Sequence, residues 1–310
     1  MLISVVIPTC HRNDLLVRCL DQFAPGRQTA AADDYEVLVS DDGQRTTAQA
    51  VICEKYSWAR WLPGPRRGPA ANRNHGAKAA QGEWIAFVDD DCEPDHAWIQ
   101  TIKEAIQAEP LDVVEGKTIT PDYVDNPFRQ GVENLHGGVY WSCNLAVRRE
   151  TIARLGGFDE DFLEAGGEDM EFAFRISKEG LRARFVPGAV VRHPVRRLTW
   201  RSIWTRLLMI RWISLYNLKT GRCPSLETGP VRLLIWLAWS RFLNLTRTSW
   251  HFFSRFERTG WRTRFFWQAI GWASFPFLFP YVATWELRFR RRERALRKQE
   301  AGRPASLSAR

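Results

Sequence analysis

The first 110 residues alternate between short, nearly unbroken apolar runs and longer amphipathic stretches. The apolar runs are too continuous for strands with one wet face, and they are typical of strands buried on both faces of a parallel sheet. The predicted strands cover Leu2–Pro8, Tyr35–Ser40, Ala59–Leu62 and Trp84–Val88. The predicted helices that follow them cover Asp14–Phe23, Ala70–Ala80 and Asp95–Ala108. This order of elements predicts an α/β domain.

The pattern is less regular after residue 110. Further strands are predicted over Asp112–Thr120, Tyr140–Val147 and Arg182–Val191, and helices over Arg149–Leu155 and Asp169–Lys178, with Gly180 as a C-terminal cap. Beyond Arg196 the chain is rich in Arg, Trp, Phe and Leu at helix-like spacing. We therefore expect an α/β domain over residues 1–195, an Arg- and Trp-rich helical region over 196–300 and a disordered tail over 301–310.

Charge divides the chain at nearly the same place. The whole sequence has 44 basic and 35 acidic residues and a net charge of +9. Residues 1–190 carry a net charge of −10, whereas residues 191–310 carry +19 together with ten of the 15 Trp. A basic, Trp-rich segment predicts an anionic partner, either a membrane surface or a nucleic acid. The apolar share of 45% excludes an intrinsically disordered chain.

The six cysteines have no CxxC spacing, which argues against a zinc site and against a thioredoxin-type motif. A disulfide framework is not expected in a chain of 310 residues, and the pattern fits a reducing cytoplasm. The N-terminal run Met1–Pro8 has no basic n-region and no small-residue cleavage site, so it reads as a buried strand rather than a signal peptide.

Two acidic clusters stand where predicted strands end. Asp41-Asp42-Gly43 ends the second strand, and Asp89-Asp90-Asp91 ends the fourth. Ligands of such sheets bind outside the carboxyl ends of the strands, so both clusters are expected in one crevice. Carboxylates on alternate residues suit Mg²⁺ with phosphate oxygens. The alternatives are a solvated turn for the second cluster and an ordinary Asp-Gly turn for the first.

Three other positions carry candidate chemistry. Glu168-Asp169 opens a predicted helix, where a carboxylate can act as general base for a hydroxyl or simply cap the helix. His193 follows the last predicted strand, and its imidazole can ligate a metal, although a lone His is more often structural. Arg73 lies on the helix between the acidic clusters and can reach a phosphate, the alternative being a surface Arg.

Taken together, these motifs resemble family 2 glycosyltransferases. The segments that carry the resemblance are Val5–Thr9, Asp41–Gly43, Gly68–Gly76, Gly82–Asp91, Asn144–Arg149, Gly156–Glu160, Glu168-Asp169, Arg175, Gly180 and Val191–His193. They cover about residues 2–195. The resemblance implies a GT-A fold, in which a Rossmann-like, mostly parallel central sheet is flanked by helices.

The resemblance also implies an inverting transfer from a nucleotide-sugar donor with Mg²⁺ or Mn²⁺. Asp41 or Asp42 would hold the nucleobase, and Arg73 would lie near the donor. Asp89 and Asp91 would form the D-x-D pair that holds ribose and metal, with His193 as a further ligand to metal or diphosphate. Asp169 would be the catalytic base, and Glu168 would support it or contact the acceptor. Pro8 and Asp90 complete the predicted donor-binding set.

One segment departs from the family pattern. Processive members usually carry Gln-x-x-Arg-Trp some forty residues after the Glu-Asp pair. The matching segment here is Leu208-Met209-Ile210-Arg211-Trp212, which has the Arg-Trp pair without the Gln. We therefore expect the transfer of one sugar, or of a few, rather than polymer synthesis.

The C-terminal region contains one long uncharged stretch. Phe265–Trp285 would form a helix about 31 Å long, near the thickness of a bilayer core. Pro276 and Pro280 interrupt it and Arg clusters flank it on both sides, so we expect a re-entrant or interfacial helix pair bent near these prolines. Leu233–Trp239 is too short to span and is expected to lie in the membrane interface. The alternative is a soluble second layer with buried Trp and surface Arg.

The sequence therefore predicts a metal-dependent glycosyltransferase at the cytoplasmic face of the cell membrane, with a lipid-linked or cell-envelope saccharide as acceptor. One alternative is a soluble transferase acting on a small or protein acceptor. A nucleic-acid-binding protein is disfavoured because no recognisable binding fold is present. A nucleotidyltransferase is disfavoured because Pro8–Arg12 stands where its Gly-rich phosphate loop is required.

Overall fold

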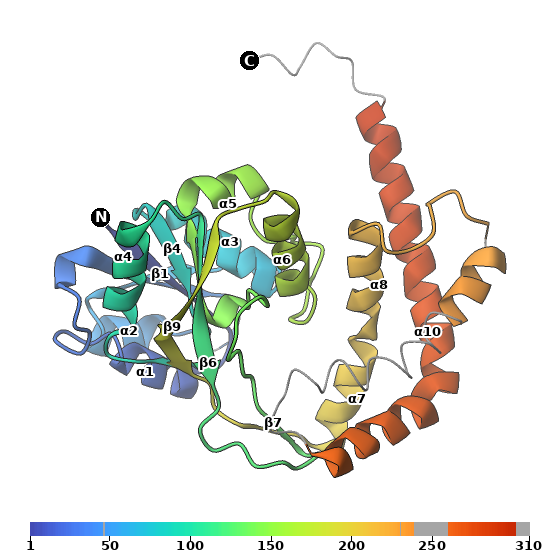
Figure 1. Ribbon diagram of the computed structural model, residues 1–310, viewed down its shortest axis with the longest axis horizontal. Coiled ribbons are helices and arrows are strands. Elements are labelled where there is room, and N and C mark those ends of the chain that lie inside the picture. The colour runs from blue at the N-terminus through green and yellow to red at the C-terminus, as the bar shows by residue number, and fades with distance from the viewer. Residues whose placement is uncertain (46, 230, 239–259, 302–310) are drawn as a thin grey trace. The chain divides into compact units, whose positions relative to one another are not determined.

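The computed structural model describes residues 1–45, 47–229, 231–238 and 260–301 (Figure 1). The chain divides into two compact units. The first comprises Met1–Tyr123 and Arg129–Arg197, and the second comprises Val124–Phe128 and Leu198–Arg310. Of the tail predicted over residues 301–310, the structure describes Ala301, which ends a helix. Residues 302–310 lie outside the described part of the chain.

An eight-stranded sheet with the order β3-β2-β1-β4-β8-β6-β9-β5 forms the middle of the first unit. Its strands are β1 (Ile3–Thr9), β2 (Tyr35–Asp41), β3 (Ala59–Pro63), β4 (Trp84–Phe87), β5 (Glu93–Pro94), β6 (Val113–Ile119), β8 (Leu145–Arg148) and β9 (Ala183–Arg192). The first four are mutually parallel, as predicted. The other half is mixed, because β8 is antiparallel to both of its neighbours and β5 is antiparallel to β9, whereas β6 and β9 are parallel.

The mixed half follows from the connection that leads into β8. Strand β6 is joined to β8 by a loop that contains the two-residue strand β7 (Arg129–Gln130) and the 3₁₀ turn η2 (Ser142–Asn144), with no crossover helix. A parallel return needs a long crossover, usually through a helix, whereas an antiparallel strand does not. Strand β9 does follow a helix, and it is parallel to β6.

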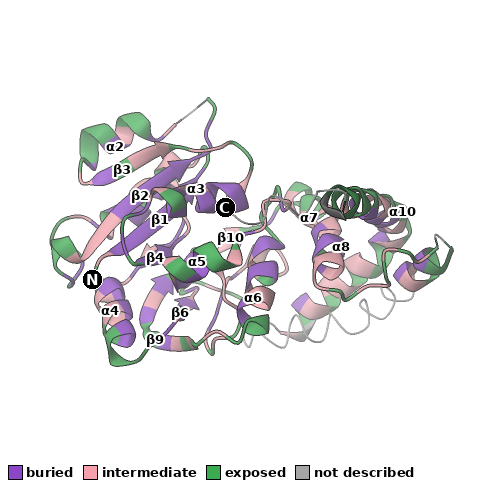
Figure 2. Cartoon of the chain, turned by 90° about the horizontal axis from the view of Figure 1, so that it is seen from above, coloured by how far each residue is buried: buried purple, intermediate pink, exposed green. Residues whose placement is uncertain are grey.

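Helices cover both faces of this sheet. One face packs against α1 (Asn13–Asp21), α2 (Gln49–Lys55) and α4 (Trp98–Ala108), and the other packs against α3 (Pro69–Ala79), α5 (Arg149–Leu155) and α6 (Glu168–Lys178). Alternate residues of β1 enter the two cores: Val5 and Ile7 belong to the first and Val6 to the second. All seven residues of β1 are buried, which explains the unbroken apolar run (Figure 2).

Several element boundaries differ from the sequence prediction. Helix α2 and the short pieces η1 (Ala32–Asp34), β5, β7 and β10 (Arg196–Arg197) were not predicted, and α4 begins at Trp98 rather than Asp95. The strand predicted over Tyr140–Val147 begins only at Leu145. The Glu115 carboxylate accepts backbone N–H bonds from residues 138, 139 and 140, which holds this stretch in a loop.

The second unit is helical. It contains α7 (Trp200–Leu208), α8 (Ile210–Lys219), a helical segment over residues 231–238 and α10 (Trp261–Ala301), while Trp239 of the predicted interfacial helix lies outside the described residues. The stretch predicted as a helix pair is one continuous helix, α10, which bends along its length and contains both Pro276 and Pro280 (Figure 1). Among the described residues, no helix is long and apolar enough to cross a membrane.

Packing inside the second unit uses the Arg-Trp pair of α8. The Arg211 guanidinium lies 4.9 Å from the Trp212 ring centroid and 5.0 Å from that of Trp285 on α10, and it donates a hydrogen bond to the Tyr281 hydroxyl. Trp212 itself is 2% exposed. These cation–π contacts and this burial give the pair a structural task between α8 and α10.

Candidate active site

The first acidic cluster organises the loops that follow β2 and β3. Asp41 accepts hydrogen bonds from the backbone N–H groups of Gly43 (2.8 Å) and Ala48 (2.6 Å) and from the Trp61 indole (3.2 Å). Asp42 accepts from the backbone N–H groups of residues 66 (2.8 Å) and 68 (3.1 Å). Both side chains are buried. Their first observable role is to shape the loops at the carboxyl edge of the sheet.

Pro8 lies one residue before the end of β1, where it pairs with Ser40 of β2. It is buried, and the next residue, Thr9, donates a 2.7 Å hydrogen bond to Asp90. The ends of β1, β2 and β4 are thus joined at this edge, as the strand pattern predicts.

A buried guanidinium links three elements beside the second acidic cluster. Arg73 on α3 donates one hydrogen bond to Asp89 Oδ1 (2.8 Å) and another to Glu168 Oε1 (3.2 Å). The second Glu168 oxygen accepts backbone N–H bonds from Gly166 (2.8 Å) and Gly167 (3.0 Å) at the start of α6. Burial alone would raise the pKa of Asp89, but Arg73 outweighs it, so that this pKa is lowered.

Asp90, the middle residue of the second cluster, is completely buried. Its carboxylate is bound by Thr9 and by the guanidinium of Arg12, which also donates a 3.1 Å hydrogen bond to Asp91. Burial raises the pKa of Asp90 to about 7, although Arg12 opposes this shift. Arg12 was not singled out from the sequence, because nothing local distinguishes it from other Arg residues near the start of a helix.

Asp169 stands at the start of α6, one residue after Glu168. Its Oδ1 atom is buried and has no hydrogen-bond partner among the described residues. Burial and the neighbouring Glu168 charge raise the pKa of Asp169 to about 7, while Arg73 acts in the opposite direction. Buried polar atoms are normally hydrogen-bonded, so this carboxyl oxygen is available to accept a hydrogen bond from a bound substrate.

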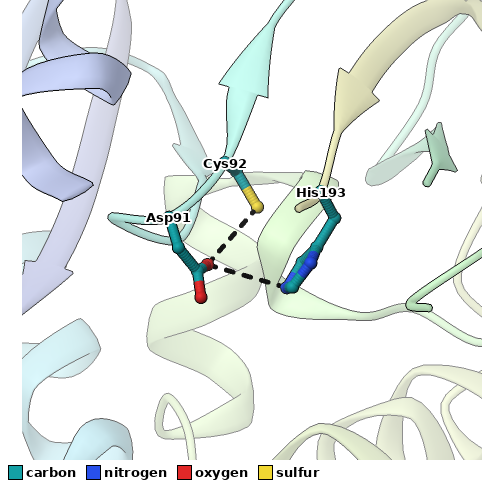
Figure 3. A group of neighbouring side chains, drawn as sticks. All are labelled: Asp91, Cys92 and His193. Carbon is teal, nitrogen blue, oxygen red and sulfur yellow. Dashed lines mark hydrogen bonds and ion pairs between the residues drawn. The ribbon is translucent and has the colours of Figure 1, made fainter. Parts of the chain in front are cut away.

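The third cluster forms where β5 meets the end of β9. Glu93 of β5 pairs with Arg192 of β9 in antiparallel register. Cys92 precedes Glu93 and His193 follows Arg192, so this register places Cys92 next to His193. His193 Nε2 lies 3.6 Å from Asp91 Oδ1, and Cys92 Sγ lies 3.8 Å from the same oxygen (Figure 3). Ligand atoms of these three buried residues all lie within 4.8 Å of one another.

The protonation of His193 follows from its contacts. Nδ1 lies 2.9 Å from the carbonyl oxygen of Pro194, which only accepts, so Nδ1 carries the proton. Arg196 Nη2 lies 3.1 Å from His193 Nε2, so Nε2 accepts this hydrogen bond. Arg196 Nη2 also lies 3.1 Å from Asp91 Oδ2. Burial lowers the pKa of His193, which favours this neutral ring. The Nε2 lone pair is therefore directed at the cluster, as a metal ligand requires.

The structure joins only part of the predicted metal set. Asp91 and His193 lie together, whereas Asp89 forms an ion pair with Arg73. Cys92 and Arg196 belong to the cluster and were missed in the sequence. Cys92 directly follows the acidic run, but its proximity to His193 depends on the pairing of a two-residue strand, which leaves no periodic signal.

Two family models match the chain. One is described as glycosyl transferase family 2 and matches residues 4–167, and the other is described as glycosyl transferase family group 2 and matches residues 128–289. Each match covers more than half of the 310 residues. The chain belongs to glycosyltransferase family 2. This confirms the family resemblance found in the sequence.

Characterised relatives from several organisms support the assignment. Validoxylamine A glucosyltransferase from Streptomyces hygroscopicus subsp. limoneus is 30% identical in an alignment of length 225 that covers 58% of this chain and 49% of that protein. Chondroitin synthase from Escherichia coli is 26% identical over 62% of this chain and 34% of that protein. Glycosyltransferase AglE from Haloferax volcanii is 26% identical over 63% of this chain and 67% of its own length. The match thus spans about half, or less, of the first three relatives found.

Solved structures show the fold. The mannosyltransferase PcManGT from Pyrobaculum calidifontis, in complex with GDP-Man and Mn²⁺, matches 93% of this chain and 84% of its own with a TM-score of 0.53 and 19% identity. TarS from S. aureus matches 94% of this chain and 92% of its own with a TM-score of 0.54 and 16% identity. The chain therefore has a mixed α/β, GT-A-like fold.

Proposed function

We propose that this glycosyltransferase moves a sugar from a nucleotide-sugar donor to a hydroxyl of a saccharide acceptor in a single inverting step. The observation that carries the proposal is Asp169, whose buried Oδ1 lacks a partner and whose pKa is raised to about 7. An acceptor hydroxyl is a weak nucleophile and requires a base near its proton. A carboxylate that titrates near neutral pH, with one oxygen unpaired, is suited to that task.

The donor is proposed to bind across the carboxyl ends of β1, β2 and β4. Of the two Asp residues at the end of β2, Asp42 has the greater remaining capacity for a nucleobase. Among the residues that the structure describes, its carboxylate accepts two hydrogen bonds and that of Asp41 accepts three, while a carboxylate offers about four acceptor positions. Asp89 accepts the hydrogen bond from Arg73 through Oδ1, and we propose that its other oxygen, Oδ2, contacts the ribose.

A divalent cation fits the residues at the end of β9. The Asp91 carboxylate and the unprotonated Nε2 of His193 face one another at 3.6 Å; this pair suits Mn²⁺, whereas Mg²⁺ would use the carboxylate oxygen alone. The PcManGT structure holds Mn²⁺ with GDP-Man, and this supports the use of such an ion. When bound, the cation would offset the negative charge that develops on the diphosphate.

The remaining residues of the site keep its carboxylates in place. Arg73 neutralises Asp89 and Glu168 and thereby holds α6 against the end of β4. Arg12 likewise donates hydrogen bonds to Asp90 and Asp91 and offsets their negative charge. Inversion requires the base on the side of the sugar opposite the leaving group and requires no covalent enzyme nucleophile.

The test is transfer by purified full-length protein, with a panel of nucleotide sugars and with Mn²⁺, Mg²⁺ or EDTA. Asp169→Asn should lower turnover by about 10²–10⁴-fold and leave nucleotide binding, read as a thermal shift, unchanged. Glu179→Gln, an exposed carboxylate beyond the C-terminal end of the same helix, is the matched control. Full turnover by Asp169→Asn would remove Asp169 from the mechanism.

The second unit is proposed to dock on an anionic membrane at the cytoplasmic face of the cell, where a lipid-linked acceptor would be presented. Large apolar side chains are exposed on α7 and α10, including Trp200 (64%), Trp204 (48%), Phe265 (66%) and Phe277 (73%). Residues 191–310 also carry a net charge of +19. Exposed aromatic side chains amid Arg favour the headgroup region of a membrane. A non-processive transfer remains proposed from the missing Gln before Arg211-Trp212.

A further inference from the structure

The Asp91–Cys92–His193 cluster combines three different donor atoms. Oxygen, sulfur and nitrogen ligand atoms lie within 4.8 Å of one another, and all three side chains are buried (Figure 3). The D-x-D pattern itself calls for oxygen ligands, so a thiol beside Asp91 and His193 is a feature of this chain that the proposed transfer does not use. Cys92 is completely buried.

The two distances from Asp91 Oδ1 to the other donor atoms are close to the edges of a tetrahedron of zinc ligands. Zinc bonds of about 2.0 Å to oxygen and nitrogen and about 2.3 Å to sulfur place tetrahedral ligands roughly 3.3–3.5 Å apart. The Asp91 Oδ1 to His193 Nε2 distance is 3.6 Å, and the Asp91 Oδ1 to Cys92 Sγ distance is 3.8 Å. The remaining pair, Cys92 Sγ and His193 Nε2, lies within 4.8 Å, and side-chain rotation would have to bring these two atoms closer when one ion binds all three donors.

We propose that Asp91, Cys92 and His193 form a three-ligand site for a borderline divalent cation, with Zn²⁺ as the best match. Thiolate and imidazole ligands suit zinc and cobalt, whereas Mg²⁺ takes oxygen ligands and requires near-octahedral geometry. The bond from His193 Nδ1–H to Pro194 O orients the ring as the outer shell of a metal site does. Three protein ligands leave a fourth position open.

Charge and protons balance at this site. Asp91 carries one negative charge, the His193 ring is neutral, and the Cys92 thiol loses its proton to solvent as the sulfur–zinc bond forms. The two negative ligands then neutralise the dication. Arg196, which now bonds both Asp91 Oδ2 and His193 Nε2, must turn away when the ion enters.

The inference shares Asp91 and His193 with the proposed donor site and so rests in part on the proposed function. Because both ions would use these two ligands, Zn²⁺ and Mn²⁺ are expected to compete for one place. Cys92 separates them: it strengthens the binding of Zn²⁺ and contributes little to Mn²⁺, whose preferred ligands are oxygen and nitrogen. The sequence indicated Asp91 and His193 as metal ligands but gave no sign of Cys92, since no CxxC spacing is involved and His193 follows a different strand.

The experiment adds Co²⁺ to full-length, metal-free protein and records its absorption spectrum. The expected result is a thiolate-to-cobalt band together with tetrahedral d–d bands, all removed by one equivalent of Zn²⁺. Cys92→Ser should abolish the thiolate band and weaken Zn²⁺ binding about 100-fold, while the Mn²⁺ affinity read by electron paramagnetic resonance stays within about twofold. Cys53→Ser, which removes an exposed thiol on α2, is the matched control and should change nothing.

Two outcomes would overturn the proposal, and the first needs no variant. One is a wild-type Co²⁺ complex that lacks a thiolate band, and the other is a band that survives Cys92→Ser and disappears in Cys143→Ser, the neighbouring buried thiol. The function and the site can fail separately. Sugar transfer with Mn²⁺ but no thiolate band would reject the zinc site alone, whereas a thiolate band without transfer from any donor would reject the proposed function alone.

Discussion

Arg73 donates a 2.8 Å hydrogen bond to Asp89, and its guanidinium is only 5% exposed. The same guanidinium reaches Glu168, so a single buried cation balances carboxylates from the end of β4 and the start of α6. A buried charge is tolerated only when it is paired in this way. The pairing joins the proposed donor side of the site to the proposed base.

Removal of the Arg73 charge should lower the free energy of unfolding of the protein. In Arg73→Gln, the buried Glu168 and the partly buried Asp89 lose their cation, and breaking such a buried pair costs about 3 kcal/mol or more. Urea unfolding followed by tryptophan fluorescence measures this change. Arg67→Gln is the control, because Arg67 pairs with Glu160 but is 62% exposed, and its loss should change stability by less than about 1 kcal/mol. Equal effects of the two substitutions would contradict the role given to Arg73.

The pH dependence of transfer should report Asp169. Its pKa of about 7 means that the base is mostly protonated below neutrality, so the rate should rise about tenfold per unit up to pH 7 and then level off. Glu168 raises this pKa, so Glu168→Gln should move the rising limb to lower pH. Initial rates from pH 5 to 9 with saturating donor measure both profiles. A limb that does not move in Glu168→Gln would show that another group titrates.

Protein stability should fall as the pH rises, because of Asp90. Its folded pKa of about 7 lies above the ordinary value of 3.8, so the folded state keeps the proton longer than the unfolded chain does. The stabilisation is complete below about pH 4 and is lost as pH rises through 7, at up to roughly 1.4 kcal/mol per pH unit. Asp90→Asn cannot titrate, so its unfolding free energy should fall less steeply between pH 4 and 7. Parallel urea curves for both proteins test this, and identical slopes would contradict it.

Part of the fold is readable in the sequence because of how burial acts on a strand. β1 has all seven residues buried, so its apolar run is continuous and its prediction was accurate to one residue at each end. The stretch from Tyr140 to Asn144 is also largely apolar, but Glu115 of a distant strand binds its backbone and prevents the predicted strand. A side chain that acts over 25 residues leaves no local pattern.

The same distinction applies to the site. Carboxylates at strand ends were found because parallel strands bring their carboxyl ends to one edge. The meeting of Cys92 with His193 was not found, because it depends on the register of β5 against β9. Two paired residues are too few to give a period, so this contact required the structure.

Arg196 should hinder the binding of a metal ion. One of its nitrogens lies 3.1 Å from Asp91 Oδ2 and 3.1 Å from His193 Nε2, so its positive charge stands where the proposed cation would be held. In Arg196→Ala, the affinity for Mn²⁺ in the absence of nucleotide should rise about tenfold, which corresponds to a gain of roughly 1.4 kcal/mol in binding free energy. Arg197→Ala, which removes the exposed neighbour, is the matched control. Titration of Mn²⁺ by electron paramagnetic resonance gives both affinities, and weaker binding in Arg196→Ala would reverse the interpretation.

Attachment to membranes should depend on both charge and aromatic side chains. Trp200 and Trp204 on α7 are 64% and 48% exposed, so their rings are available to enter the headgroup region. The full-length protein should sediment with vesicles that contain anionic lipid and much less with neutral vesicles, and added salt should weaken the binding. The double variant Trp200→Ser/Trp204→Ser should lower the bound fraction several-fold, while the thermal midpoint should fall only slightly, because Trp200 is largely exposed and its folded contacts include the rings of Phe128 and Phe266. Equal sedimentation with neutral and anionic vesicles, or no loss in the double variant, would assign the exposed aromatic side chains to another partner.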